Sequence, residues 1–200
     1  MARPRTFDET SVLDAAAREF RAHGFAETST EQLCEAAGVR RSSLYNAFVS
    51  KDELFVRALE HYTDTIRQRQ RAVLADDTRP GAERLRALVD LVVGEEREAA
   101  GHGHGAGCMV VQSLMDPDLR ARDARVARLL ERDLRERTGL LAGAIRAGRV
   151  DGSIAGGPDP EDGAMLVNTV ISGLRVTAQT GADPETLHKI ALVGLAALLG

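Results

Sequence analysis

The sequence predicts an all-α protein of about nine helices, and three observations support this fold class. Apolar residues recur four apart in one segment after another, as on the buried face of a helix. Helix-capping residues precede several of these segments, and stretches rich in Gly and Pro separate them. Apolar residues make up 44% of the chain, which is enough for a substantial core. The predicted helices are residues 8–23, 29–37, 41–48, 51–74, 82–98, 108–115, 118–147, 161–180 and 184–199.

The first helix is predicted to begin at Asp8 or Thr10 and to end where Gly24 closes it. Its buried stripe consists of apolar residues four apart, Val12, Ala16 and Phe20.

A helix, a tight turn and a second short helix are predicted next. Ser29 can cap the first of the two, and Gln32 completes the reciprocal Ser-x-x-Gln pattern in which each side chain satisfies a free backbone N–H. Gly38 ends that helix because glycine readily adopts the left-handed conformation that the turn requires. The second short helix runs from Arg41 to Phe48.

This second short helix has two different faces. Leu44 and Phe48 share the buried face, while Ser42 and Asn46 lie on the opposite side. Residues 39–51 contain three cations and no acid. Side chains of this kind contact base edges and phosphates when a helix enters a major groove. The predicted DNA-contacting residues are Ser29, Thr30, Arg40, Arg41, Ser42, Ser43, Tyr45, Asn46 and Lys51.

The stretch from Ser11 to Glu60 closely resembles the DNA-binding domain of the TetR family of transcriptional regulators. The residues that carry the resemblance are Ala16, Phe20, Gly24, Phe25, Thr28, Ser29, Ala37, Gly38, Val39, Leu44, Tyr45, Phe48, Ser50, Lys51 and Leu54. The resemblance implies a three-helix helix-turn-helix domain over residues 1–50 and a helical ligand-binding and dimerisation domain over residues 51–200. It also implies that Tyr45 and Lys51 contact phosphates. From its own chemistry, the Asn46 amide could read adenine, and the Arg41 guanidinium could read guanine.

The chain departs from the family pattern at Arg40, where the family usually has Ser or Thr. The second short helix therefore lacks its usual N-cap and gains a cation. Either Arg40 contacts phosphate, or Ser42 caps a shorter helix.

The net charge is −4 with a pI near 5.8, so any DNA contact must come from a local basic surface. Two cysteines imply no disulfide framework, and the N-terminus has no signal-peptide pattern. The longest apolar run, Ile190 to Leu199, is about half of the ~20 residues that a membrane span needs. We therefore expect a cytoplasmic protein without a membrane partner.

The last two predicted helices are unusually apolar. Paired with their symmetry mates they would form a four-helix bundle, which predicts a homodimer with a two-fold interface. The alternative is that these helices close the core of the monomer.

Cys108 is predicted to begin a helix after a glycine-rich loop that contains His102 and His104. A Gly-Cys dipeptide in this position resembles a subset of the family that includes electrophile sensors. The other interpretation is a small buried apolar residue. The two histidines and the cysteine match no closed zinc pattern, so we expect neither a metal nor a cofactor.

All seven aromatic residues precede residue 63, so the ligand pocket is predicted to be mainly aliphatic. The candidate ligand-binding or sensing residues are Tyr62, Cys108, Met109, Gln112, Met115, Met165, Asn168, Thr169, Ser172 and Arg175.

The sequence therefore predicts a regulator, most simply a repressor, that binds a palindromic operator as a homodimer and responds to a small-molecule or electrophile signal. No catalytic motif is visible. The alternative is an enzyme or ligand carrier that uses the His102, His104 and Cys108 loop, with a degenerate helix-turn-helix.

Overall fold

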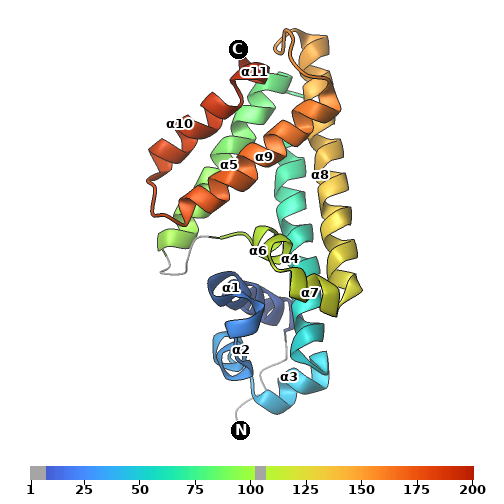
Figure 1. Cartoon of the computed structure of the whole chain (residues 1–200), viewed down its shortest axis with the longest axis vertical. Coiled ribbons are helices and arrows are strands. Elements are labelled where there is room, and N and C mark those ends of the chain that lie inside the picture. Colours follow the sequence, from blue (N-terminus) through green and yellow to red (C-terminus); the bar gives the residue numbers. More distant parts are fainter. Residues whose placement is uncertain (1–7, 102–106) are drawn as a thin grey trace. The chain divides into compact units, whose positions relative to one another are not determined.

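The computed structural model describes residues 8–101 and 107–200, and it confirms the all-α fold class (Figure 1). Within these ranges there are eleven helices and no strand. The number exceeds the predicted nine because two predicted helices, 118–147 and 184–199, are each broken in two. None of the helices in these ranges is long and apolar enough to cross a membrane.

The chain forms two compact units. The first comprises Met1–Asp64 and Met109–Leu129, and the second comprises Thr65–Cys108 and Leu130–Gly200. The predicted domains, residues 1–50 for DNA binding and residues 51–200 for ligand binding and dimerisation, are defined by function and not by compactness. That division stays a prediction.

The first unit contains the three N-terminal helices, a short pair from later in the chain, and the starts of two long helices. The regular part of the first helix ends at Gly24 as predicted, because that glycine has φ 76° and ψ 171°, and one further turn continues to Glu27. The helices are α1 (Glu9–Glu27), α2 (Thr30–Ala37), α3 (Arg41–Phe48), α6 (Met109–Met115), α7 (Pro117–Arg122), and the first parts of α4 (Lys51–Leu74) and α8 (Ala124–Asp151).

The core of the first unit is aromatic. The Phe20 and Phe55 rings meet edge to face with centroids 4.9 Å apart, and Phe25 meets Phe55 in the same way at 5.1 Å. Such arrangements align ring edges with ring faces and are favourable beyond simple burial. Phe20 and Phe55 are almost fully buried.

The prediction of one helix over residues 118–147 is wrong, because the chain is extended at Asp123 (φ −136°, ψ 108°). The Asp123 carboxylate accepts a hydrogen bond from the backbone N–H of Arg125 at 2.9 Å and also binds the Arg125 guanidinium. A short acidic side chain that binds nearby backbone favours a helix start over a helix interior. α7 therefore ends at Arg122, and α8 begins at Ala124.

The buried side of α8 includes an acid. Asp133 is 5% exposed, whereas the neighbouring Leu134 is 39% exposed. At 3.6 residues per turn, the buried line through Val126 and Leu130 continues to Asp133 and then to Arg137, whose guanidinium lies 3.5 Å from the Asp133 carboxylate.

The second unit has an aliphatic core formed by α5 (Gly81–Gly101), α9 (Pro160–Ala178) and α10 (Pro184–Gly194), together with the remainder of α4 and α8. α5 contacts both α9 and α10 (Figure 1). The last predicted helix is interrupted at Leu195 (φ −98°, ψ 8°), after which α11 (Ala196–Leu199) follows. Leu195 and Leu198 are buried in this core.

Candidate nucleic-acid interface

The start of α2 carries the predicted capping box. The Ser29 hydroxyl accepts from the Gln32 N–H at 3.2 Å, and the Ser29 N–H donates to the Gln32 side-chain oxygen at 2.7 Å. Two backbone donors of the first turn are thereby satisfied. Thr30 is the first residue of α2, so its side chain lies at the same helix end.

The turn between α2 and α3 depends on Gly38, which has the predicted left-handed conformation with φ 65° and ψ 29°. The N–H of Gly38 donates to the Glu35 carbonyl, and the N–H of Val39 donates to the Cys34 carbonyl at 3.0 Å. These bonds satisfy the last carbonyls of α2 and turn the chain directly into α3.

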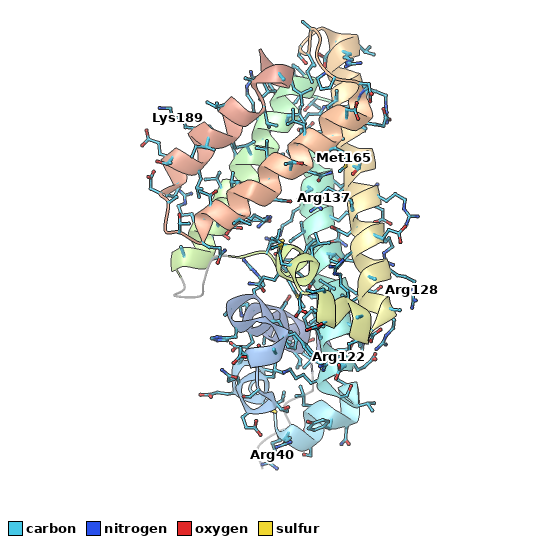
Figure 2. The ribbon with its side chains drawn as sticks, in the orientation of Figure 1. Arg40, Arg122, Arg128, Arg137, Met165 and Lys189 are labelled. Carbon is cyan, nitrogen blue, oxygen red and sulfur yellow. The ribbon has the colours of Figure 1, made fainter. Side chains whose placement is uncertain are left out.

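Both faces of α3 are as the sequence predicted. Leu44 and Phe48 are buried, whereas Ser42 and Asn46 are exposed and Ser43 is half-buried. Arg40 occupies the N-cap position with no side-chain capping bond, and it is exposed beside α3 (Figure 2). The alternative in which Ser42 caps a shorter helix is wrong, because α3 begins at Arg41, ahead of Ser42.

A cluster of four side chains links the first turn of α2 to α3. Arg41 Nη1 lies 2.8 Å from Glu31 Oε1, and its guanidinium lies 5.5 Å from the centre of the Tyr45 ring. The Tyr45 hydroxyl is 3.4 Å from the Thr30 hydroxyl. Hydrogen bonds from Thr30 and Arg41 lower the pKa of Tyr45.

Glu31 was missed by the sequence analysis. Residues 39–51 contain no acid, but Glu31 brings a carboxylate to Arg41 from ten residues earlier. Helical periodicity gives no signal for such a contact, since it depends on how α2 and α3 cross. Among the predicted DNA contacts, the structure brings Thr30, Arg41 and Tyr45 together through Tyr45, and Glu31, which was not predicted, pairs with Arg41.

Lys51, the first residue of α4, is turned toward the end of α1. Its Nζ lies 3.4 Å from the Ala26 carbonyl oxygen and 4.6 Å from the centre of the Phe25 ring. Partial burial lowers the pKa of its ammonium group. A phosphate contact by Lys51 stays a prediction.

Val49, between α3 and α4, has an unusual backbone conformation with φ 58° and ψ −44°. A β-branched residue is strained at positive φ because its Cβ crowds the backbone. Its N–H donates to the Tyr45 carbonyl at 3.0 Å, and its side chain is 77% exposed. Local strain thus accompanies the sharp turn that joins the two helices.

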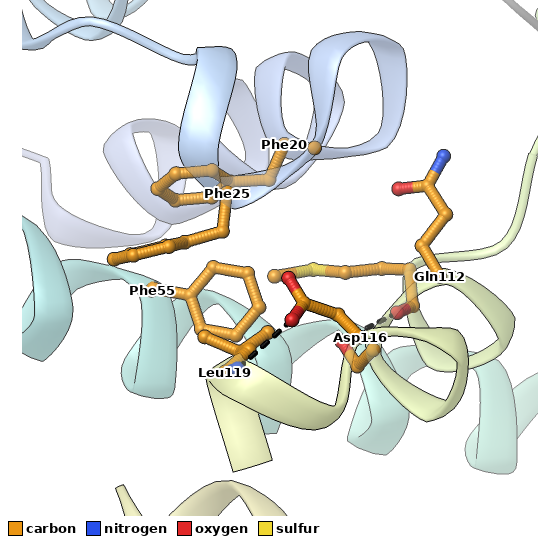
Figure 3. A pocket seen from close by; sticks show the side chains of 9 residues that line it. Phe20, Phe25, Phe55, Gln112, Asp116 and Leu119 are labelled. Carbon is orange, nitrogen blue, oxygen red and sulfur yellow. Dashed lines mark hydrogen bonds between the residues drawn. The ribbon is translucent and has the colours of Figure 1, made fainter. Parts of the chain in front are cut away.

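A small cavity of about 40 Å³ lies beside the aromatic core of the first unit (Figure 3). This volume holds a water molecule or two and is far below the size of an organic effector. Gln112 donates from its side-chain amide to the Arg21 carbonyl at 2.6 Å, which ties α6 to α1. The lining residues are Phe20, Gly24, Phe25, Phe55, Met109, Gln112, Ser113, Asp116 and Leu119.

The ten predicted ligand-binding residues are divided between the units. Met109 and Gln112 line the cavity of the first unit, which also contains the half-buried Tyr62 and the 79% exposed Met115. The second unit contains the other six. Cys108 directly precedes α6 and is 5% exposed, and α9 carries buried Asn168 and Arg175, half-buried Ser172, and exposed Met165 and Thr169.

No group of three or more potential metal ligands occurs among residues 8–101 and 107–200. His102 and His104, which the alternative interpretation needs, lie outside those ranges.

Residues 12–58, which contain the face described above, match the family "Bacterial regulatory proteins, tetR family". A solved structure of the TetR family transcriptional regulator CifR, a cysteine mutant complexed with a 26 bp double-strand operator DNA, is 30% identical. The match covers 98% of this chain and 99% of that one, with a TM-score of 0.78. The chain belongs to the TetR family of transcriptional regulators.

Two relatives from Escherichia coli (strain K12) are HTH-type transcriptional repressors by name. ComR is 28% identical over 198 residues, covering 94% of this chain and 88% of ComR. BdcR is 36% identical over 124 residues, covering 62% of this chain and 61% of BdcR.

The second unit of this TetR-family chain contains a buried charge cluster. Arg175 of α9 binds Glu96 through Nη1 at 2.6 Å and Glu95 through Nη2 at 2.7 Å, both from α5. The side chains of Arg175 and Glu96 are 4% and 1% exposed. Glu96 Oε2 has no hydrogen-bond partner among the described residues. Arg175, predicted as a handle for a ligand, is thus engaged by two carboxylates.

Proposed function

We propose that this TetR-family chain is a transcriptional repressor that binds a roughly palindromic operator as a homodimer and leaves it on a small-molecule or electrophile signal. The observation that carries the proposal is the exposed face of α3, where Arg40, Arg41, Ser42, Tyr45 and Asn46 surround a buried Leu44 and Phe48. The repressor names of ComR and BdcR and the operator complex of CifR support it.

The contacts divide by chemistry. Asn46 can bind the N6 and N7 edge of adenine and Arg41 the O6 and N7 edge of guanine, which are the groups that specify sequence in a major groove. Arg40, Tyr45 and Lys51 suit phosphates, which position a protein without specifying sequence. Ser29, Thr30, Ser42 and Ser43 add short polar groups at the starts of α2 and α3, where free backbone N–H groups also attract phosphate.

The DNA-binding proposal is tested by operator selection followed by a gel shift with DNA that flanks the chain's own gene. An Asn46→Ala variant should lose roughly tenfold or more in affinity for the selected site, because a bidentate base contact is removed. Gln68→Ala removes an exposed amide from α4 and serves as the matched control. Absence of any preferred sequence for the wild type would refute the proposal.

The dimer proposal rests on exposed apolar side chains of the last long helices. Val176 of α9 is 54% exposed, and Ile190 and Val193 of α10 are 53% and 69% exposed. Pairing of these helices with their symmetry mates would cover this surface in a two-fold interface. Sedimentation should give twice the chain mass for the wild type and a smaller species for Val193→Glu. Val150→Glu, at a valine of α8 that is 90% exposed, should stay dimeric.

The effector proposal has two forms, and Cys108 separates them. A thiolate sensor requires access for the electrophile, yet Cys108 is 5% exposed. Mass spectrometry of the native protein after mild electrophile treatment therefore tests the covalent form. An unlabelled Cys108, together with intact induction of Cys108→Ala, would leave a noncovalent ligand as the signal.

A further inference from the structure

The pair formed by Glu31 and Arg41 is unexpected on the proposed DNA-binding surface, because it adds a negative charge there. It puts a carboxylate 2.8 Å from the guanidinium that we assign to base reading. The two side chains are 71% and 64% exposed, so neither is held by burial. Exposed pairs of this kind change a folding equilibrium by about fivefold at most. Folding stability therefore gives little reason for an acid in this position.

The pair has a larger effect on what Arg41 can do. A free arginine is attracted to any phosphate, and this attraction supplies most of the affinity for non-specific DNA. Glu31 neutralises that charge, and the Tyr45 ring holds the guanidinium from a second side. A carboxylate beside DNA is repelled by phosphates, and in the major groove it can accept hydrogen bonds only from the amino groups of cytosine and adenine.

We propose that Glu31 is a specificity-determining residue that acts by positioning Arg41. On arbitrary DNA, Arg41 stays paired with Glu31 and contributes no phosphate contact. On the operator, the guanidinium reaches a base edge from this fixed position. Specificity is a difference between two affinities, and Glu31 increases that difference by weakening binding to the wrong sequences. The inference rests on the proposed DNA-binding function.

The test compares Glu31→Gln with Glu35→Gln. Both positions are exposed on α2 and both substitutions remove one negative charge, but Glu35 lies one turn further along the helix, and no side-chain bond joins it to α3. Affinities for the selected operator and for a scrambled duplex are measured by fluorescence anisotropy over a series of salt concentrations. Thermal melting verifies that both variants are folded.

Glu31→Gln should bind the scrambled duplex about three- to tenfold more tightly at low salt. Its salt dependence should steepen by up to about 0.9 in log–log slope, as expected for one additional phosphate contact. The operator affinity should change less, so that the ratio of specific to non-specific affinity falls. Glu35→Gln should keep the wild-type ratio.

A double variant isolates the route of the effect. In an Arg41→Ala background, Glu31→Gln should no longer change the ratio, because the side chain that Glu31 positions is gone. An unchanged ratio in the single variant, equal changes in Glu31→Gln and Glu35→Gln, or an effect that persists without Arg41 would each overturn the inference while leaving the proposed function in place. A wild type that binds both duplexes equally would overturn the proposed function and this inference together.

Discussion

The two units of the molecule use arginine–glutamate contacts in opposite ways. In the first unit, Arg41 and Glu31 meet on an exposed surface, where the pair adds little stability and both side chains remain accessible to solvent. In the second, Arg175 binds Glu95 and Glu96 with almost no exposure to solvent. A buried ion pair of this kind is costly to break and ties α9 to α5.

The cores of the two units also differ, in the kind of side chain that fills them. Phe20, Phe25 and Phe55 fill the first unit, whereas the second has no aromatic residue in the sequence from Thr65 onward. Aliphatic side chains and backbone-to-backbone contacts fill its core. The first unit therefore has an aromatic core and an exposed arginine–glutamate pair, whereas the second has an aliphatic core and a buried one.

The largest expected effect is in the buried cluster. Arg175→Met leaves Glu96 buried without its cation and leaves Glu95 with Arg69 at 3.5 Å, and it should lower the free energy of unfolding by about 3–5 kcal/mol. Urea unfolding followed by circular dichroism measures this. The control is Arg146→Met, whose partner Glu161 is 64% exposed, and its loss should stay below about 1 kcal/mol. Equal losses would remove the distinction between buried and exposed pairs.

The next effect concerns the close contact between α5 and α8 in the second unit. A Cβ at Gly81 would lie 2.3 Å from the Gly148 nitrogen, so Gly81→Ala should cost about 1–3 kcal/mol in unfolding free energy. Gly94 lies in the same helix with open space around its Cα, and Gly94→Ala should add up to about 1 kcal/mol. Thermal melts should therefore show a lower melting temperature for Gly81→Ala and a higher one for Gly94→Ala than for the wild type.

In the first unit, by contrast, a glycine should help. Val49→Gly relieves the strain of φ 58° and loses little burial, so we expect a gain of about 1 kcal/mol. A stability loss in denaturant unfolding would mean that the surroundings favour this conformation for valine. Operator affinity measured on the same variant would tell whether the strained turn also positions α3.

A smaller gain is expected from Arg40→Ser, which restores a capping side chain to α3 and should add about 0.5–1 kcal/mol. The same variant tests the role of Arg40 in DNA binding. If Arg40 contacts phosphate, the salt dependence of operator binding should weaken by about 0.9 in log–log slope. An unchanged or higher affinity would show that Arg40 makes no DNA contact.

The smallest effect concerns pH and the second unit. Asp151 accepts hydrogen bonds from the N–H groups of Gly81 and Ser153, both at 2.8 Å, and bonds with these two residues lower its pKa below the usual 3.8. Its contribution to stability is therefore complete above about pH 4 and is lost as the pH falls through the lowered pKa. The melting temperatures of the wild type and Asp151→Asn should differ at pH 7 and converge as the pH falls from about 4 through the lowered pKa. A constant difference would exclude the carboxylate as the cause.

The helices and the two faces of α3 were largely predictable, because they depend on residue patterns within one helix or turn. The capping box at Ser29, the left-handed Gly38 and the buried positions Leu44 and Phe48 all follow from spacing within one helix or turn. The break at Asp123 was missed because an aspartate inside a charged segment reads equally well as a solvated helix position. In the structure, the Asp123 carboxylate accepts from the Arg125 N–H, so Asp123 precedes the start of α8.

Contacts between helices account for the remaining errors and omissions. Glu31 meets Arg41 and Glu96 meets Arg175 across 10 and 79 residues of sequence, and no periodic pattern encodes such distances. Among the candidate sensing residues, Arg175 was expected to offer a polar group to a ligand, but it is buried. Cys108, for which the sequence left open a sensor thiol or a small buried apolar residue, is buried as well. A ligand pocket built on these residues stays a prediction.

The order of the helices along the chain has a consequence for how the protein folds during synthesis. The first unit is discontinuous: it needs α6 and α7, which follow Asp64 by more than forty residues of intervening chain. During synthesis, the core around Phe20 and Phe55 is covered only after Met109 and Leu119 have left the ribosome. An N-terminal fragment that ends at Asp64 would therefore leave this core uncovered. A fragment that ends at Leu129 would cover it, but it would separate α5 from α9 and α10, so no single cut in the chain yields a complete first unit alone.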